Sequence, residues 1–421
     1  MNAPREPGSG ASVRILGALA LVLASGSLLF EGVIRPAGGG FKGYVDFAPY
    51  YRGAVALVRG LDPYDLATTD AIGKELGVTE AEGFRYLYPP VFALLASPLA
   101  ALPYPAAKAV WCALNVALLL GTIFLLPGAV VPNPQPAERR LVLFLAAAFL
   151  PVLETLRLGQ ANLIPLFLAV FALHALGRGR PVSAGFAVGL ASATKVTPAA
   201  LLGLFLFRRQ WRAFLSGGAS AAALLVLGFA VCPSESFGSF RGHVLTWYAR
   251  GHASVSNQSP QGFFLRALTG AASPQSPDPS DPATQTAAAL ARVVALAVLA
   301  TVGLVLLRKR RATLAEEFGL VLSTLPLVSA ITWVHHLVLL LPAFAAVFLG
   351  LVREGTPPRG KAALAIVAYA LVALPLGYDH PAMRVPALLP LVSTKLAGTL
   401  ILFGILLRDV AAGSRDVSGG P

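Results

Sequence analysis

Apolar residues fall in long blocks along this chain, and shorter polar stretches separate the blocks. A helix needs about 20 apolar residues to cross the hydrocarbon core of a bilayer. The pattern therefore predicts an all-α polytopic membrane protein with about ten to twelve transmembrane helices. We expect the spans at residues 13–33, 89–102, 105–126, 139–156, 161–176, 182–207, 213–232, 285–307, 314–331, 337–352, 362–376 and 387–407.

The first long polar segment, residues 34–88, contains a pattern of its own. Phe47, Tyr50 and Tyr51 recur at helical spacing, which predicts a helix lying in the membrane interface with its aromatic face against lipid. Residues 60–64, Gly-Leu-Asp-Pro-Tyr, are of the types that favour a turn, so we expect the helix to end there.

A second long polar segment covers residues 233–284. We assign residues 13–407 to a single transmembrane domain that carries both segments as loops. The flanking residues 1–12 and 408–421 are predicted to be cytoplasmic tails, the first of them disordered.

The composition agrees with a membrane protein and excludes two other classes. Hydrophobic residues make up 56% of the 421 positions, charged residues make up 13%, and the mean hydropathy is +0.70. A soluble domain carries about 25% charged residues, and a disordered chain needs low hydrophobicity. Cys112 and Cys232 lie in or beside apolar blocks and form neither a metal-binding spacing nor a disulfide framework.

The net charge of +13 comes from basic clusters between the apolar blocks and does not indicate nucleic-acid binding. Such clusters stay on the cytoplasmic side of membrane proteins. We place residues 308–311, residues 353–361 and the C-terminus on the cytoplasmic side. Both long polar segments then lie outside. Arg178 and Arg180 also favour the inside, but they lie outside if every apolar block crosses completely. A re-entrant pair of helices in this region would remove the conflict.

Residues 182–207 form an apolar block that Lys195 and Pro198 interrupt. Pro198 has no N–H to donate to the carbonyl of Thr194. The block is therefore either one broken span or two half-helices that meet inside the bilayer. A cation at such a break suits an anionic ligand, for example a lipid phosphate. The alternative is a structural ion pair, for example with Glu154.

Two adjacent histidines, His335 and His336, follow Trp333 at the predicted outer end of a span. A tandem pair points in two directions, so at most one of them easily faces a given site. Such a histidine can bind a phosphate or a sugar hydroxyl, or carry a proton. The alternative is a Trp/His belt that anchors the span at the interface.

Asp46 stands at the start of the predicted interfacial helix, where two roles are open. Aspartate is a favoured N-cap residue, and a carboxylate at the outer membrane surface is equally suited to act as a general base. Asp62, by contrast, is better explained as a turn residue.

Amide and arginine side chains supply further candidates for binding sugar hydroxyls and phosphate. Asn257, Gln258 and Arg266 lie in the second outer segment, and their alternative role is to hydrogen-bond the loop. Gln160 and Asn162 lie where a span begins, and their alternative role is to cap it.

Together these residues carry a resemblance to a known family. The motifs, in order, are Asp46-Phe47-x-x-Tyr50-Tyr51, Gly60-Leu61-Asp62-Pro63-Tyr64, Tyr88-Pro89-Pro90-Val91, Gly159-Gln160-Ala161-Asn162, Lys195-Val196-Thr197-Pro198, Arg208-Arg209-x-Trp211-Arg212, Asn257-Gln258-Ser259 and Trp333-x-His335-His336. Over residues 44–345 the chain resembles glycosyltransferase family 87, the polyprenyl-phosphate-mannose-dependent α-(1→2)-mannosyltransferases. Each motif alone is weak, and their ordered sum is specific for the family but not for one substrate.

The resemblance implies a GT-C-type fold with its active site on the extracytoplasmic side of the plasma membrane. It further implies a glycosyltransferase that moves a sugar, expected to be mannose, from a polyprenyl-phosphate donor to a lipid or glycan acceptor by an inverting mechanism. The implied partners are the donor, a glycolipid or glycan acceptor and membrane lipids, without nucleic acid. No cofactor is implied beyond the lipid-linked sugar donor.

The same resemblance assigns roles residue by residue. The catalytic candidates are Asp46, which matches a carboxylate that acts as the base, and His335 or His336, which match an outer-face histidine. Donor or phosphate binding is assigned to Lys195, Arg266, Asn257, Gln258, Gln160 and Asn162. Substrate binding is assigned to Tyr50, Tyr51, Asp62, Tyr64 and Tyr88.

Members of the wider fold often have two adjacent acidic residues in the first outer loop, whereas Phe47 follows Asp46 here. We therefore assign no metal ligand and leave dependence on a divalent metal open.

Three alternatives remain open from the sequence. One is a lipid or sugar transporter (flippase), which uses charges inside the membrane and often has repeated halves. This chain has no clear repeat, and its acidic residues concentrate in an outer segment. The others are a polyprenyl-phosphate-arabinose-type transferase of the same fold and a non-catalytic family member that acts as an assembly partner.

Overall fold

The computed structural model describes residues 9–35, 44–78, 80–270, 277–308, 312–354, 358–375, 388 and 391–413. These residues form helices joined by turns, and an isolated antiparallel bridge pairs Asn257 with Trp333. The prediction of an all-α protein is confirmed. Most of the two predicted tails, residues 1–8 and 414–421, lies outside the described residues.

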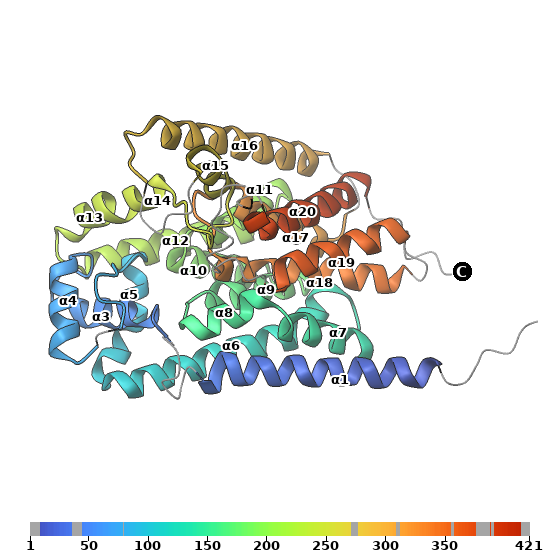
Figure 1. Ribbon diagram of the computed structural model, residues 1–421, viewed down its shortest axis with the longest axis horizontal. Coiled ribbons are helices and arrows are strands. Elements are labelled where there is room, and N and C mark those ends of the chain that lie inside the picture. The colour runs from blue at the N-terminus through green and yellow to red at the C-terminus, as the bar shows by residue number, and fades with distance from the viewer. Residues whose placement is uncertain are drawn as a thin grey trace, which may run out of the picture.

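The long helices run along the long axis of the molecule, and the short helices of the two polar segments gather toward one end (Figure 1). The helices of the bundle are α1 (Ser9–Leu29), η1 (Phe30–Ile34), α6 (Tyr104–Val130), α7 (Pro136–Ala147), α8 (Leu150–Leu158), α9 (Leu163–Gly177), α10 (Pro181–Thr194), η3 (Thr197–Ala199), α11 (Ala200–Phe207), α12 (Trp211–Ala230), α16 (Pro282–Leu307), α17 (Leu314–Val328), η5 (Val334–Leu340), α18 (Leu341–Arg353), α19 (Arg359–Ala373), η8 (Leu391–Ser393) and α20 (Thr394–Ala412). Those of the polar segments and their borders are α3 (Phe47–Val58), α4 (Leu66–Glu75), α5 (Pro90–Ala96), η2 (Ser97–Ala101), α13 (Ser236–Ser239), η4 (Phe240–Leu245), α14 (Thr246–Arg250) and α15 (Pro260–Thr269).

Six helices of the described residues are long and apolar enough to cross a membrane, and the pair α7 and α8, bent by 54°, makes up to seven. The six are Gly17–Ile34, Tyr104–Val130, Trp211–Ala230, Pro282–Leu307, Val334–Arg353 and Leu391–Ala412. The sequence-based number is higher because it counts every apolar block as one crossing. Five blocks, at 89–102, 161–176, 182–207, 314–331 and 362–376, form helices of at most 17 residues, which do not meet the length of a full span.

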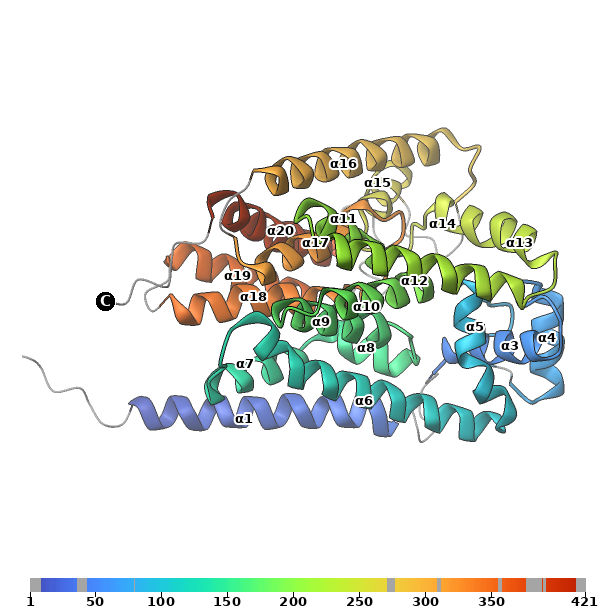
Figure 2. The ribbon, with the colours of Figure 1, turned by 180° about the vertical axis from the view of Figure 1, so that it is seen from behind.

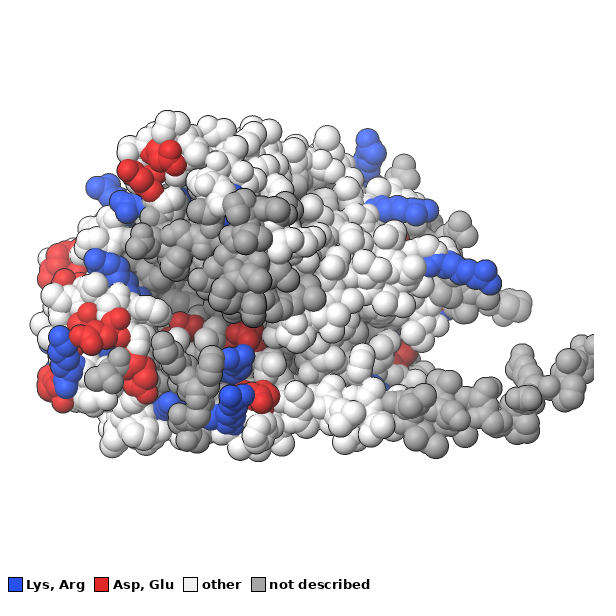
Figure 3. Space-filling view, in the orientation of Figure 1, with Lys and Arg blue, Asp and Glu red and all other residues white. Residues whose placement is uncertain are grey.

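The two ends of the bundle differ in charge. Figure 3 shows acidic and basic residues mixed over the end that holds α3, α4 and α5, basic residues at the opposite end, and a mostly uncharged band between them. We call the opposite end the basic end. Ion pairs join helix ends there, namely Arg208 with Glu317 at 2.6 Å, Arg353 with Glu138 at 2.7 Å and Lys361 with Asp409 at 3.1 Å.

The block at residues 182–207 folds as two half-helices that meet at Lys195. The first half, α10, ends at Thr194, and the backbone of Lys195 is extended, with φ −150° and ψ 119°. The second half, η3 followed by α11, begins at Thr197. Of the two predicted alternatives, the pair of half-helices is confirmed and the single broken span is wrong.

Both ends of this helical pair lie at the basic end of the bundle. α10 runs parallel to α12, because Gly185 lies directly against Ser216 and Gly189 lies directly against Ser220. Since α12 begins shortly after α11 ends, the start of α10 and the end of α11 share one end of the bundle, and Figure 2 shows α10, α11 and α12 close together. This arrangement has the form of the re-entrant pair that the sequence offered, and it places the basic cluster that precedes α10 at the basic end.

The predicted interfacial helix is present as α3, but its aromatic face is buried in the protein. Phe47, Tyr50 and Tyr51 are at most 4% exposed. Phe47 stacks on Trp111 of α6 with ring centroids 5.4 Å apart, and Tyr50 meets Phe92 of α5 edge to face at 5.1 Å. The expected contact with lipid is wrong because α5 and α6 cover this face, and periodicity alone cannot tell a neighbouring helix from lipid.

Candidate active site

Asp46 is held where the first polar segment meets the end of α8. Its N–H donates to the carbonyl of Leu158 at 3.0 Å, and its Oδ2 accepts from Gln160 Nε2 at 2.8 Å. Although Asp46 occupies the N-cap position of α3, its side chain makes no capping hydrogen bond. The capping alternative is therefore wrong, and the carboxylate is directed to Gln160.

The surroundings of Asp46 change its acidity. Burial raises the pKa of its carboxyl to about 6, because desolvation disfavours the charged form. The hydrogen bond from Gln160 and the charge of Lys195 act in the opposite direction, and the charge of Glu154 adds to the rise. With this pKa the carboxyl is mostly ionised at neutral pH and is a stronger base than an ordinary aspartate. These properties suit a general base.

Gln160 connects Asp46 to two buried tyrosines. Its Oε1 accepts from the hydroxyls of Tyr50 at 2.9 Å and Tyr88 at 3.1 Å, and the two hydroxyls lie 3.0 Å apart. Because both tyrosines donate to Oε1, the amide nitrogen is left to donate to Asp46. Four of the predicted site residues thus form one hydrogen-bonded network.

Lys195 lies beside this network, at the turn between the half-helices. Its Nζ donates to Asn162 Oδ1 and lies over the ring of Tyr88, 5.7 Å from the centroid. It directly follows the C-terminus of α10, where the helix dipole favours a cation. Glu154, the alternative ion-pair partner, pairs with Arg157 at 3.0 Å.

The two histidines have different surroundings. The ring of His335 is buried, its Nε2 has no hydrogen-bond partner among the described residues, and its backbone carbonyl accepts from Asn162 Nδ2 at 3.1 Å. His336 is half-buried and lines a small pocket with Lys195. The two rings meet edge to face, with centroids 4.8 Å apart. The structure therefore brings His336 to the pocket beside Lys195, whereas His335 is not part of the pocket lining.

This pocket is lined mainly by polar side chains, namely Asn162, Lys195, Thr197, Ser329, Thr332 and His336. The hydroxyl of Thr197 is buried and has no partner within the described part of the chain. The hydroxyls of Ser329 and Thr332 donate to backbone carbonyls. The free Thr197 hydroxyl beside the Lys195 cation suits an anion with several oxygens, such as a phosphate.

Gly159 fixes the junction between α8 and Asp46. Its φ is +68°, and a Cβ added to it would lie 2.5 Å from Cδ1 of Tyr44. Trp111 Nε1 donates to its carbonyl at 2.7 Å. A side chain at this position is therefore strained by the backbone and blocked by its neighbour.

We expect Gly159→Ala to lower the thermal unfolding midpoint of the purified protein more than Gly179→Ala does. Gly179 also has a positive φ, +69°, but nothing lies within 4 Å of an added Cβ, so it is a control for backbone strain alone. The difference between the two variants in the free energy of unfolding, obtained from these midpoints, measures the overlap with Tyr44, and we expect it to be about 1–3 kcal/mol. Equal midpoints for the two variants would contradict the close approach.

Three predicted substrate-binding residues support the fold of the first outer segment. Tyr51 donates its hydroxyl to a backbone carbonyl at 2.8 Å, and Tyr64 donates to the carbonyl of Tyr88 at 2.9 Å. Asp62 Oδ1 accepts from the N–H of Tyr64 at 3.0 Å and from Ser236 Oγ at 2.9 Å, as its interpretation as a turn residue predicts. The structure does not bring these three side chains into the network of Asp46.

Asn257, Gln258 and Arg266 hold the second outer segment against the bundle. Asn257 Oδ1 accepts from the N–H of Thr332 at 2.8 Å, Gln258 Nε2 donates to two backbone carbonyls at 2.7 and 2.8 Å, and Arg266 donates to two more at 2.7 and 2.9 Å. All three are at most 1% exposed, and burial lowers the pKa of Arg266 to about 10. The structure therefore shows the alternative role, hydrogen bonding of the loop.

Sequence reasoning missed three residues that hold or line the site. Trp111 fixes the carbonyl of Gly159, and Thr155 Oγ1 donates to the carbonyl of His335 at 3.3 Å. Both lie in apolar blocks, where no sequence signal separates them from packing residues. Thr197 lines the pocket and stands in the Lys195 motif, so that motif was the signal for it.

The arrangement joins a proton acceptor, Asp46, to a cation, Lys195, in buried surroundings. Such a pair suits the transfer of a group to a hydroxyl with an anionic leaving group, because the base takes the proton and the cation stabilises the leaving charge. Among the described residues, no three His, Cys, Asp or Glu side chains gather in a way that could hold a metal ion.

Comparison with known proteins gives three relatives. A polyprenol-phosphate-mannose-dependent alpha-(1-2)-phosphatidylinositol mannoside mannosyltransferase of Mycobacterium tuberculosis is 32% identical over 279 residues, which are 61% of this chain and 60% of that protein. The protein of the same name in Mycolicibacterium smegmatis is 32% identical over 165 residues, 36% of this chain and 37% of that protein. A polyprenol-phosphate-mannose-dependent alpha-(1-2)-phosphatidylinositol pentamannoside mannosyltransferase of Mycolicibacterium smegmatis is 28% identical over 342 residues, 81% of this chain and 77% of that protein.

The first two alignments span less than two thirds of the length of those relatives. The model of glycosyltransferase family 87 matches residues 86–330, more than half of the chain. This range includes Gln160 and Lys195, whereas Asp46 and His336 lie outside it. The resemblance expected from the ordered motifs is confirmed. The chain belongs to glycosyltransferase family 87.

Proposed function

We propose that this chain transfers mannose from a polyprenyl-phosphate-mannose donor to a glycolipid acceptor in the membrane. The observation that carries the proposal is the buried Asp46 carboxyl, with a pKa near 6, beside the Lys195 cation. Membership of the family supports glycosyl transfer. The names of the three relatives, each polyprenol-phosphate-mannose-dependent, support the donor.

In the proposed reaction Asp46 takes the proton of an acceptor hydroxyl. The hydroxyl oxygen bonds to the anomeric carbon as the bond from that carbon to the phosphate oxygen breaks, and polyprenyl phosphate leaves with the electron pair. Attack from the face opposite the phosphate inverts the anomeric centre, through an oxocarbenium-like transition state. Gln160 orients the Asp46 carboxylate, because its own amide is fixed by Tyr50 and Tyr88.

The leaving phosphate, in this proposal, binds in the pocket beside Lys195. The ammonium stabilises the charge that grows on the phosphate as the glycosidic bond breaks. The unpaired hydroxyl of Thr197 and the ring of His336 supply further hydrogen-bonding groups in the same pocket. A phosphate is a good leaving group, so the mechanism needs no strong acid.

The proposed acceptor is a phosphatidylinositol mannoside and the proposed linkage is α-(1→2), following the names of the relatives. We further propose that the basic end faces the cytoplasm, as the positive-inside rule favours. Asp46 and both long polar segments then lie toward the outer face of the plasma membrane.

We expect the transfer rate to fall as the pH drops below about 6, the pKa of the Asp46 carboxyl. The base must be deprotonated, so each pH unit below this value should cost about tenfold in kcat/KM, and the rate should be level just above it. Initial rates from pH 4.5 to 8 measure the profile. Samples returned from low pH to pH 7 must regain full activity, which separates titration from unfolding. A flat profile across pH 6 would contradict the assignment.

The function is tested with membranes that contain the full chain, a phosphatidylinositol mannoside acceptor, and either polyprenyl-phosphate-mannose or polyprenyl-phosphate-arabinose. We expect mannose transfer only, with a product that an α-(1→2)-specific mannosidase cleaves. Transfer of arabinose instead would identify the sister activity of the same fold. Movement of the donor across the membrane without any glycosidic product would identify a transporter.

A further inference from the structure

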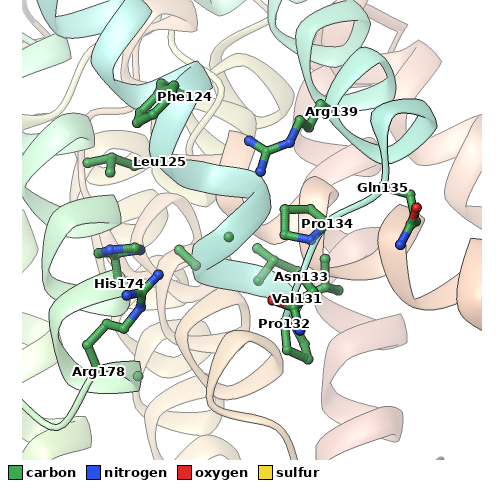
Figure 4. A pocket seen from close by; sticks show the side chains of 14 residues that line it. Phe124, Leu125, Val131, Pro132, Asn133, Pro134, Gln135, Arg139, His174 and Arg178 are labelled. Carbon is green, nitrogen blue, oxygen red and sulfur yellow. The ribbon is translucent and has the colours of Figure 1, made fainter.

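A large pocket lies at the basic end of the bundle, where α6 ends, α7 begins and α9 ends (Figure 4). Its volume is about 870 Å³. Figure 4 shows Arg139 of α7 on one side of it, and His174 and Arg178 from the end of α9 on the other. The proposed transfer reaction uses none of these residues.

The polar part of this pocket is basic. None of its lining residues is acidic, and within the described ranges neither Arg139 nor Arg178 forms an ion pair. The neighbouring Glu138 does not neutralise them, because its carboxylate accepts from Arg353 at 2.7 and 3.1 Å. His174 Nδ1 is buried and lacks a partner in the described part of the protein. A guanidinium group can bind two oxygens of one phosphate at the same time, so this surface suits a phosphate group.

The rest of the pocket is apolar. Phe124 and Leu125 of α6 line it, and Phe124 is 74% exposed on the outside of the bundle. A ligand that fills the pocket therefore needs both an anionic head and an apolar part. A free phosphate ion has only the first, and pockets of about 300–1,000 Å³ hold much larger ligands.

The pocket is distinct from the active site. Along α6, Gly128 at the pocket follows Trp111, which stacks on Phe47 next to Asp46, by 128 − 111 = 17 residues. At 1.5 Å per residue this is about 25 Å. The hydrocarbon core of a bilayer is about 30 Å thick. The pocket therefore lies near the membrane surface opposite to the one closer to Asp46.

We propose that this pocket binds the phosphate-bearing headgroup of an anionic phospholipid from the leaflet at the basic end. Arg139 and Arg178 hold the phosphate from two sides, and His174 contributes a third polar contact. The acyl chains leave along the exposed face of Phe124. This site would tie α6, α7 and α9 to the lipid around them, and it does not depend on the transfer reaction.

The test is thermal unfolding of the full chain, purified in detergent, with phosphatidylglycerol, phosphatidylcholine or inorganic phosphate added. We expect phosphatidylglycerol to raise the unfolding midpoint, whereas the other two have little effect at the same concentration. An equal rise with phosphatidylcholine would overturn recognition of the anionic head. An equal rise with inorganic phosphate would overturn the lipid as the ligand.

The double variant Arg139→Gln/Arg178→Gln should need at least about tenfold more phosphatidylglycerol for half of the maximal rise. Arg140→Gln is the matched control, because Arg140 is exposed next to Arg139 on α7 but does not line the pocket. A double variant that responds like the wild type would overturn the role of the two arginines. If that variant does not fold, the single variants Arg139→Gln and Arg178→Gln are compared with the wild type in the same way, and a response like that of the wild type in both would overturn the proposal.

Discussion

Replacing Asp46 by Asn is expected to lower the turnover of mannose transfer by about 10²- to 10⁴-fold. The Asn side chain has the same size, and its Oδ1 can still accept from Gln160 Nε2, which lies 2.8 Å from the carboxylate. The change therefore keeps the packing and removes the proton acceptor. The KM for the donor should change little, because in the proposed reaction the carboxylate acts on the acceptor hydroxyl. Initial rates in membranes, normalised to the amount of folded protein, measure both quantities.

Asp278→Asn is the control for this substitution. Asp278 belongs to the other long polar segment and accepts hydrogen bonds from Ser280 at 2.7 and 2.8 Å, far along the chain from the network of Asp46. The rate of mannose transfer by the Asp278→Asn protein should match that of the wild type. Turnover near the wild-type level in a folded Asp46→Asn protein would mean that another group takes the proton.

Lys195→Met is the second change with a large expected effect, a loss of about 10²- to 10³-fold in kcat/KM for the donor. Methionine resembles the lysine stem in length, so the turn between α10 and η3 keeps its packing while the charge is removed. Part of the loss should appear in kcat, because the attraction between the ammonium and the phosphate grows as the glycosidic bond breaks. Rates over a range of donor concentrations separate the two parameters.

Lys74→Met provides the matched control, since Lys74 is 67% exposed and pairs with Glu82 in the first outer segment. It should leave both parameters unchanged. If Lys195→Met also leaves donor KM and kcat unchanged, the phosphate binds elsewhere, and the pocket of Thr197 and His336 loses its proposed role.

Much of the site was predictable because a membrane protein tolerates few polar residues in apolar blocks. Lys195 was visible for this reason, and Pro198 beside it indicated the break that the structure shows between α10 and η3. Gln160 and Asn162 were found because amides at the start of an apolar block suit sugar hydroxyls and phosphate as well as a capping role. Their partners, Asp46 and Lys195, come from other elements and only the fold brings them together.

Other residues had two open roles that the sequence alone could not separate. Asn257, Gln258 and Arg266 look like ligand-binding residues because they are polar, but buried backbone carbonyls need donors as much as ligands do. A sequence does not show which of the two a side chain serves. The aromatic face of α3 was assigned to lipid for a similar reason, since lipid and the side chains of α5 and α6 are equally apolar.

The length of α10 sets the depth of the proposed phosphate site at Lys195. Its 14 residues rise about 21 Å from the basic end, so Lys195 lies roughly 10 Å short of the far edge of a 30 Å hydrocarbon core. A sugar phosphate that reaches it has to leave the headgroup layer and descend into the protein. Water is scarce in the hydrocarbon core, so a sugar phosphate bound at this depth in the proposed reaction is protected from hydrolysis. In the proposed reaction, the pair of half-helices thus supplies a site away from bulk water as well as a cation.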